Sequence, residues 1–142
     1  MADAQTAPED LFDAAFEIWD RAYVPYSHYK VAAAIRTPSG RIYAGVNVEN
    51  ASYPVGTCAE AGAIAAMVAG GDRDIVEIAV LADGGELVTP CGGCRQRIME
   101  FGGPHAAVWA GDLHGRRRRS TAGELLPLAF GPKAMASEPA PD

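Results

Sequence analysis

The chain has 142 residues, the length of one ordinary folded domain, which excludes a two-domain enzyme. Its 12 Lys and Arg against 18 Asp and Glu give a net charge of -6, which argues against a surface that attracts nucleic acid or anionic membrane as a whole. The 27 Ala and 16 Gly indicate a core in which backbones pack closely instead of being separated by large side chains. A small domain of this kind buries little area, and a homo-oligomeric interface is one common remedy.

Two features bear on location. No apolar run approaches the roughly 18 residues that a membrane-spanning helix needs, so we expect no contact with a membrane. Residues 1–10 are acidic and polar, without the basic start and apolar middle of a secretory signal. We therefore expect a cytoplasmic protein, in which three Cys favour metal binding or catalysis over a disulfide framework.

The first part of the chain predicts a helix followed by a hairpin. Apolar residues recur at helical spacing over residues 10–23, and Pro25 follows them as a helix breaker. Residues 30–37 and 41–46 have the character of two strands, and the short turn between them contains Gly40.

The rest of the chain alternates predicted helices and strands, in the order helix 58–69, strand 75–82, helix 91–101, strand 106–110 and helix 121–126. The last helix begins with Thr121 and Glu124 at the spacing of a capping box. Residues 133–142 are polar and rich in Pro, so we expect a loose tail on a single domain that spans residues 1–142. This order favours an α/β fold, with a mixed sheet covered by helices on both faces.

All three cysteines fall at the starts of predicted helices, where exposed N–H groups favour the thiolate that binds metal. Two residues separate Cys91 from Cys94 in the sequence, so both sulfurs can reach one ion, and Cys58 would be the third ligand. Three thiolates leave one position of a tetrahedral Zn²⁺ open, as in catalytic zinc sites. Glu60 lies on the same helical turn as Cys58, so its carboxylate can act there as a proton shuttle.

Other interpretations of these residues exist. Thr57 and Glu60 also have the spacing of a capping box, which on local sequence alone is the commoner meaning. The Cys-x-x-Cys pair also matches a redox pair, or half of a structural zinc site closed by one of three histidines, His28, His105 or His114. Neither alternative explains why Cys58, Glu60 and the Cys-x-x-Cys pair occur together, so the combination favours catalytic zinc.

The pattern Cys-x-Glu followed by Pro-Cys-x-x-Cys is a signature of zinc-dependent nucleobase deaminases. From about Tyr23 to Pro132 the chain strongly resembles the small, homotetrameric cytidine deaminases. The matching segments are residues 23–27, 45–51, 57–60, 90–96 and 124–127. The resemblance implies a three-layer α/β/α sandwich around a five-stranded mixed sheet.

The resemblance also implies the reaction, which is hydrolysis of cytidine or 2'-deoxycytidine to the uracil nucleoside and ammonia in pyrimidine salvage. Zinc would provide a nucleophile at neutral pH, while Glu60 would carry protons from water to ring N3 and to the departing amino group. In such a tetramer the active sites are shared between subunits. The helix after Cys58 is rich in small residues, which would allow neighbouring helices to approach closely: Ala59, Ala61, Gly62, Ala63, Ala65 and Ala66.

Further residues match substrate-binding positions of these relatives. Asn47 and Glu49 match a ribose-binding pair that holds the 3'-hydroxyl, where a carboxylate would repel a 3'-phosphate and so favour a free nucleoside. By composition alone, the same stretch is an ordinary polar loop after a strand. The other matching positions near the substrate are Ala51, Tyr53, Ala59, Tyr29 and Phe130, of which Ala51, Tyr53 and Phe130 would reach a neighbouring subunit's site.

The chain departs from its relatives at Ala61, where an Arg commonly follows the catalytic Glu and offsets the thiolate charge. Three thiolates around one divalent zinc carry a net charge of -1, which makes a bound water a weaker acid. We hypothesise that Arg95, next to Cys94, provides the compensation together with the two helix N-termini. In lacking this Arg the chain also resembles the blasticidin-S deaminases, which share the cysteine motif, although those usually lack the full Asn-x-Glu-Asn ribose segment.

One feature points to a different function, the run of four Arg at residues 116–119. Such a run can contact phosphates, as in a deaminase of polynucleotides. It also directly follows a predicted turn at residues 112–115, in a hairpin at the edge of the sheet, where charged side chains suit a solvated strand. The edge interpretation is favoured, and a nucleic acid partner is not expected. Three hypotheses therefore stand: a nucleoside deaminase, a deaminase of another aminopyrimidine or a polynucleotide, and a non-catalytic zinc module.

Overall fold

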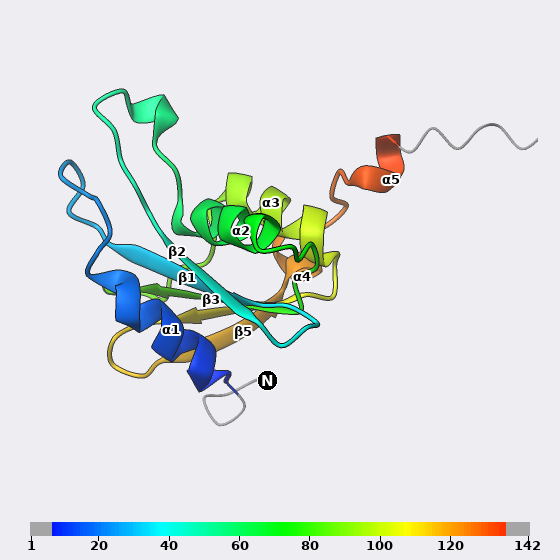
Figure 1. Ribbon diagram of the computed structural model, residues 1–142, viewed down its shortest axis with the longest axis horizontal. Helices are drawn as coiled ribbons and strands as arrows, with labels where there is room; N and C mark the ends of the chain where they lie inside the picture. Colours follow the sequence, from blue (N-terminus) through cyan, green and yellow to red (C-terminus); the bar gives the residue numbers. More distant parts are fainter. Residues whose placement is uncertain (1–6, 136–142) are drawn as a thin grey trace, which may run out of the picture.

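Figure 1 shows the computed structural model, which describes residues 7–135. The strands are β1 (Val31–Arg36), β2 (Ile42–Val46), β3 (Glu77–Ala82), β4 (Ala107–Gly111) and β5 (Arg117–Thr121). They form one sheet in the order β2-β1-β3-β4-β5. Only β3 and β4 run parallel, and every other neighbouring pair is antiparallel, so the sheet is mixed as expected.

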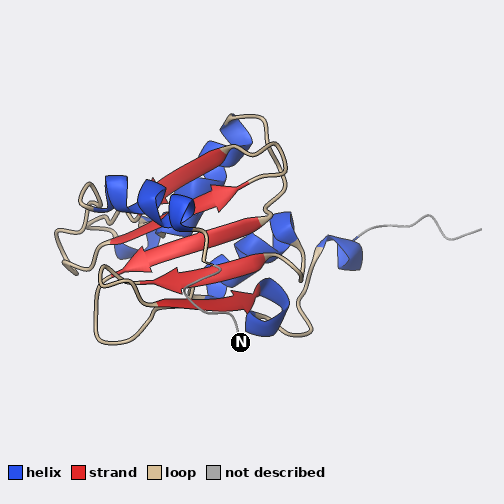
Figure 2. Ribbon diagram, turned by 90° about the horizontal axis from the view of Figure 1, so that it is seen from below, coloured by secondary structure: helices blue, strands red, loops and turns tan. Residues whose placement is uncertain are grey.

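Helices cover both faces of this sheet, which confirms the three-layer α/β/α architecture (Figures 1 and 2). The helical elements are α1 (Glu9–Trp19), the 3-10 turn η2 (Tyr53–Val55), α2 (Ala59–Ala69), α3 (Gly92–Gly102), α4 (Ala122–Leu125) and α5 (Pro132–Met135). On one face, α1 buries Leu11 and Phe12 against small strand residues such as Ala34. On the other face, α2, α3 and α4 share one apolar core. No helix among residues 7–135 is long and apolar enough to cross a membrane.

Small residues bring α2 directly onto β2. A Cβ atom added to Gly45 on β2 would lie 2.6 Å from the carbonyl carbon of Gly62 and 2.8 Å from the carbonyl oxygen of Ala59. Because no side chain fits in that space, only glycine at position 45 allows this approach. The abundance of Ala and Gly therefore serves close packing within one chain, between the sheet and the helix that follows Cys58.

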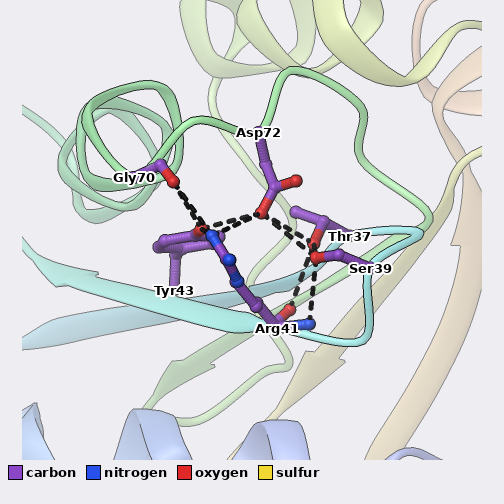
Figure 3. A network of polar contacts seen from close by, with 6 residues as sticks. All are labelled: Thr37, Ser39, Arg41, Tyr43, Gly70 and Asp72. Atoms are coloured by element: carbon purple, nitrogen blue, oxygen red, sulfur yellow. Dashed lines mark hydrogen bonds and ion pairs between the residues drawn. The ribbon is translucent and has the colours of Figure 1, made fainter.

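A polar network fixes the opposite end of α2 to the β1–β2 hairpin (Figure 3). The Asp72 carboxylate accepts hydrogen bonds from the hydroxyls of Tyr43, Thr37 and Ser39, at 2.7, 3.2 and 3.2 Å. The guanidinium of Arg41 donates to the carbonyl oxygen of Gly70, which ends the helix, at 3.0 Å. The hairpin thus supplies partners for a helix terminus that would otherwise lack them.

The first helix is shorter than predicted. The helical spacing extends to residue 23, but α1 ends at Trp19, whose indole N–H donates to the carbonyl oxygen of Lys30 at 3.0 Å. Tyr23 instead forms an isolated parallel bridge with Val48. The pairing with a distant segment overrides the local pattern at this point.

The C-terminal predictions are partly confirmed. The side chains of Thr121 and Glu124 form the expected capping box at the start of α4. The tail was expected to be loose from residue 133, but Pro132–Met135 forms the short helix α5, with Pro at a first helical position that needs no N–H. The rest of the predicted tail, residues 136–142, and most of the polar N-terminus, residues 1–6, lie outside the described residues.

Candidate active site

The three cysteines meet between the N-termini of α2 and α3. Cys58 is the residue before α2, Cys91 is the residue before α3, and Cys94 lies in the first turn of α3. Their sulfur atoms all lie within 4.8 Å of one another, and the sulfurs of Cys58 and Cys91 are 3.8 Å apart. Two thiolates on a tetrahedral zinc, each about 2.3 Å from the metal, are separated by about 3.8 Å. The cluster therefore fits one zinc ion per chain.

The electrostatics of the thiols also suit a metal. Burial raises the pKa of the Cys58 and Cys94 thiols. Burial also opposes ionisation of Cys91, but hydrogen bonds from the Cys94 backbone N–H and from the other two thiols outweigh it and lower the pKa of Cys91. A cation shared by all three sulfurs stabilises the thiolate forms that burial alone disfavours.

No histidine joins this cluster. Among residues 7–135, the only group of metal-ligating side chains that lies close enough to hold an ion consists of the three cysteines. The alternative of a structural zinc site closed by His28, His105 or His114 is therefore wrong. A fourth position is left to a small molecule, as in catalytic zinc sites.

Glu60 lies in the first turn of α2 with only 4% of its surface exposed. The residue that caps α2 is Cys58, and no side chain caps the helix, so the capping-box interpretation of Thr57 and Glu60 is wrong. Burial raises the pKa of the Glu60 carboxyl, opposed by a hydrogen bond with Cys94 and by the positive charge of Arg97. A buried carboxyl whose protonated form is favoured is suited to take up and pass on a proton.

A cavity of about 330 Å³ joins the metal cluster to the predicted ribose-binding residues. Its walls include Cys58, Cys91 and Glu60, and also Asn47 and Glu49. The remaining lining residues come from strands and loops that flank the site: Val31, Val48, Gly56, Thr57, Ala59, Val80, Val88 and Thr89. Three of these lie in segments that match the family, Val48, Thr57 and Ala59. The others lie outside those segments and were not predicted: Val31, Gly56, Val80, Val88 and Thr89.

The two predicted ribose-binding side chains already make contacts within the chain. The Asn47 side-chain oxygen accepts from the Val31 backbone N–H at 3.0 Å, and its amide donates to the Tyr29 carbonyl oxygen at 2.8 Å. Glu49 accepts from the backbone N–H groups of Tyr26 and Ser27, at 3.0 and 3.1 Å, and from the Ser27 hydroxyl. Hydrogen bonds from the Ser27 side chain, then from the two backbone groups, hold the pKa of Glu49 below its usual range.

The remaining predicted substrate residues lie outside the residues that line this cavity within the described chain: Tyr29, Ala51, Tyr53 and Phe130. Tyr53 contributes instead to a neighbouring cavity of about 340 Å³ that shares Glu49, and its ring meets Tyr26 edge-on at 5.7 Å. Phe130 is 60% exposed, and its carbonyl oxygen accepts from the Gln96 side chain at 2.7 Å. One chain therefore does not bring these four side chains into the 330 Å³ cavity.

The expected role of Arg95 at the thiolates has no support in its contacts. Its guanidinium donates to the carbonyl oxygens of Pro90 and Leu125, at 2.7 and 2.9 Å, and to the Thr89 hydroxyl at 2.9 Å. Arg97 instead donates to the Cys94 sulfur at 3.5 Å. The reason is helical geometry, because Arg97 lies three residues after Cys94 and shares its face, whereas the next residue points elsewhere. Arg97 is therefore a residue of the site that the sequence analysis did not predict, because it does not directly follow a cysteine in the sequence.

The arginine run is only partly a solvated edge. Arg116 donates to the buried Asp112 carboxylate at 2.6 Å, and Arg117 donates to Glu9 while its guanidinium lies 3.9 Å from the centre of the Phe12 ring. Both side chains therefore hold the fold together. Half of the run is thus committed to internal contacts instead of a phosphate backbone.

Comparisons with known proteins agree with this site. Residues 5–110 match the family described as the cytidine and deoxycytidylate deaminase zinc-binding region. A cytidine deaminase of Halalkalibacterium halodurans is 42% identical over 120 residues, which cover 84% of this chain and 91% of that protein. One from Mycobacterium tuberculosis is 41% identical over 110 residues, which cover 78% of this chain and 79% of that protein.

Solved structures are similar as well. The crystal structure of cytidine deaminase from Burkholderia pseudomallei superimposes with a TM-score of 0.83 at 40% identity, over 88% of this chain and 100% of that one. The enzyme from Mycobacterium tuberculosis gives a TM-score of 0.74 at 38% identity, over 87% of this chain and 96% of that one. With the cysteine cluster, the buried glutamate and the fold all in agreement, the chain belongs to the zinc-binding cytidine and deoxycytidylate deaminase family.

Proposed function

We propose that this protein is a zinc-dependent hydrolase that converts cytidine and 2'-deoxycytidine to uridine and 2'-deoxyuridine with release of ammonia, a reaction of pyrimidine salvage. The observation that carries this proposal is one cavity lined by Cys58, Cys91 and Glu60 together with Asn47 and Glu49. A cytosine nucleoside needs both sets of groups, a proton-transfer centre for its base and hydrogen-bonding groups for its sugar.

Zinc at the three sulfurs would supply a Lewis acid that makes a water molecule more acidic than bulk water. Glu60 takes a proton from the attacking water and delivers it to ring N3 as the new C–O bond forms at C4. Glu60 then takes the remaining proton from the new C4 hydroxyl and transfers it to the amino nitrogen as the C4–N bond breaks, which gives the C4 carbonyl of the uracil nucleoside and ammonia. The burial that raises the pKa of Glu60 suits a group that must both accept and donate.

Glu49 supports a free nucleoside as the substrate. Its hydrogen bonds keep the carboxylate ionised, so it accepts from a 3'-hydroxyl and repels a 3'-phosphate. Arg116 and Arg117 are engaged with Asp112 and Glu9, which argues against their use in binding a polynucleotide. We therefore rank the polynucleotide reaction below nucleoside deamination.

We further propose a homotetramer with shared active sites. Tyr53 and Phe130 support it, because they are 72% and 60% exposed on one chain and lie outside its 330 Å³ cavity. Large exposed apolar side chains of this kind favour a contact with another subunit. Light scattering coupled to gel filtration tests the assembly, and an active monomer would contradict it. The cytoplasmic location stays a prediction.

A substrate panel tests the proposed specificity. Cytidine, 2'-deoxycytidine, cytosine, blasticidin S and single-stranded DNA are each incubated with zinc-loaded protein, and ammonia release is measured. We expect turnover of the two nucleosides alone. Turnover confined to blasticidin S would assign the other aminopyrimidine reaction, and turnover confined to DNA would assign the polynucleotide reaction. If none of the five compounds reacts, the protein is a non-catalytic zinc module.

A further inference from the structure

An arginine not expected at the metal centre contacts one of its ligands. The guanidinium Nη1 of Arg97 lies 3.5 Å from the sulfur of Cys94, which is itself completely buried. Arg97 as a residue is exposed, so its side chain reaches back from solvent toward the first turn of α3. Helical side chains lean toward the N-terminus of their helix, which places position 97 over position 94.

The cluster has a surplus of negative charge that this contact addresses. Three thiolates and one divalent zinc carry a net charge of -1, and the nearby Glu60 carboxylate adds to it when ionised. Position 61, on the same turn as Glu60, is Ala and carries no charge. The guanidinium of Arg95 is committed to Thr89 and to two backbone carbonyl groups. In the part of the chain that the structure describes, Arg97 is the one arginine in contact with a ligand sulfur.

The sequence of α3 leaves space for this guanidinium. A Cβ atom at Gly93 would lie 3.3 Å from Nη1 of Arg97, which is tighter than an ordinary van der Waals contact. Glycine at position 93 therefore allows the Arg97 side chain to lie along the first turn without being displaced. Gly93 thus provides the space that Arg97 needs to reach the sulfur of Cys94.

We propose that Arg97 is a positioning residue of the metal centre, which donates to the Cys94 sulfur and offsets the excess charge of the three-thiolate cluster. This role deepens the proposed function, since it rests on zinc being bound by the three cysteines. A hydrogen bond from a cation to a thiolate draws electron density away from the sulfur and offsets part of its charge. Arg97 would thus reduce the excess negative charge around the metal and help it to act as a Lewis acid.

The test measures the metal centre separately from turnover. Wild type, Arg97→Gln and Arg97→Lys are loaded with zinc, and the zinc is titrated with a chromophoric chelator at neutral pH. Each protein is also loaded with Co²⁺, whose sulfur-to-metal charge-transfer absorption reports on the electron density of the thiolates. Arg118→Gln is the matched control, because it removes an exposed arginine from β5 at the far edge of the sheet.

We expect Arg97→Gln to bind zinc about tenfold more weakly, the low end of effects seen when an outer partner of a metal ligand is lost. Its charge-transfer band should shift to lower energy, and Arg97→Lys should restore part of both properties. Arg118→Gln should match wild type. The inference is overturned if Arg97→Gln retains zinc and the cobalt spectrum of wild type. A wild-type protein that binds no zinc would instead contradict the proposed function and remove the premise of this inference.

Discussion

The sulfur of Cys58 lies 3.8 Å from the sulfur of Cys91, although 33 residues separate them along the chain. The fold achieves this by placing α2 and α3 on the same face of the sheet, with their N-termini together. A metal ion held there ties two helices that contribute to one core. The site and the stability of the fold are therefore coupled.

Replacement of a ligand should uncouple the two helices. We expect Cys91→Ser to lose zinc, to have no measurable deaminase activity and to unfold at a lower temperature than zinc-loaded wild type. Plasma emission measures the metal, and calorimetry measures the Tm. A chelator should lower the Tm of wild type but not that of Cys91→Ser. An equal fall in both proteins would show that zinc does not act through this cluster.

Loss of the proton shuttle should affect turnover and not the metal. Glu60→Gln keeps the shape of the side chain but cannot accept a proton, so kcat for cytidine should fall by about 10² to 10⁴. Steady-state kinetics with zinc analysis measures both properties, and Glu17→Gln on α1 is the control. Full activity in Glu60→Gln would refute the assignment of the acid and base.

The role of Glu49 can be separated from its contacts with Ser27. A hydrogen bond to a charged group contributes roughly 1.5 to 3 kcal/mol, so Glu49→Gln should raise the KM for cytidine by about tenfold or more. Ser27→Ala removes the internal donor and keeps the carboxylate, so its KM should change little. Wild type should disfavour 3'-deoxycytidine, and Glu49→Gln should treat it much like cytidine. If Glu49→Gln still discriminates between cytidine and 3'-deoxycytidine as wild type does, Glu49 has no role at the ribose.

Close packing of the site helix predicts a large effect of one methyl group. Gly45→Ala places a Cβ atom less than 3 Å from backbone atoms of Gly62 and Ala59, so α2 must move away from β2. We expect the free energy of unfolding to fall by roughly 1 to 3 kcal/mol, the usual cost of overpacking. The variant should also retain zinc more weakly than wild type. Gly131→Ala, which meets no atom within 4 Å, is the control in denaturant titrations. Equal stability of the two variants would contradict this packing.

Asp72 should make stability depend on pH. Hydrogen bonds from Tyr43, then from Ser39 and Thr37, hold the pKa of Asp72 below its ordinary value in the folded protein. A lowered folded-state pKa contributes stability that is present above the unfolded pKa of about 4 and is lost as pH falls through the folded pKa. Asp72→Asn should therefore lower the Tm more at pH 7 than at pH 3. The same deficit at both pH values would exclude the carboxylate charge as its source, and Asp13→Asn is the control.

Local patterns predicted the fold well where they matched the tertiary structure. The period of each apolar run located β1, β2 and β3 to within two residues, and the spacing of Thr121 and Glu124 identified a true capping box. Thr57 and Glu60 have the same spacing but form no capping box. Glu60 is buried in the cavity instead, and this burial depends on the tertiary fold, which a four-residue pattern does not record.

The contacts that sequence reasoning missed are those between segments far apart, or one helical turn apart. The end of α1 depends on the bridge from Tyr23 to Val48, which no pattern near residue 23 records. Arg117 depends on Glu9, which lies 108 positions earlier. Arg95 follows Cys94 directly in the sequence, but a helix places the third residue after Cys94, Arg97, on the same face as the sulfur.

The central claim is that one cavity combines a three-cysteine zinc centre with Glu60 and a ribose-binding pair for cytosine nucleosides. The most direct test purifies the wild-type protein, measures its zinc content, and follows cytidine through the loss of its absorbance together with ammonia release. We predict one zinc per chain and one ammonia for each cytidine lost. A fully zinc-loaded protein that leaves both cytidine and 2'-deoxycytidine unchanged would contradict the account.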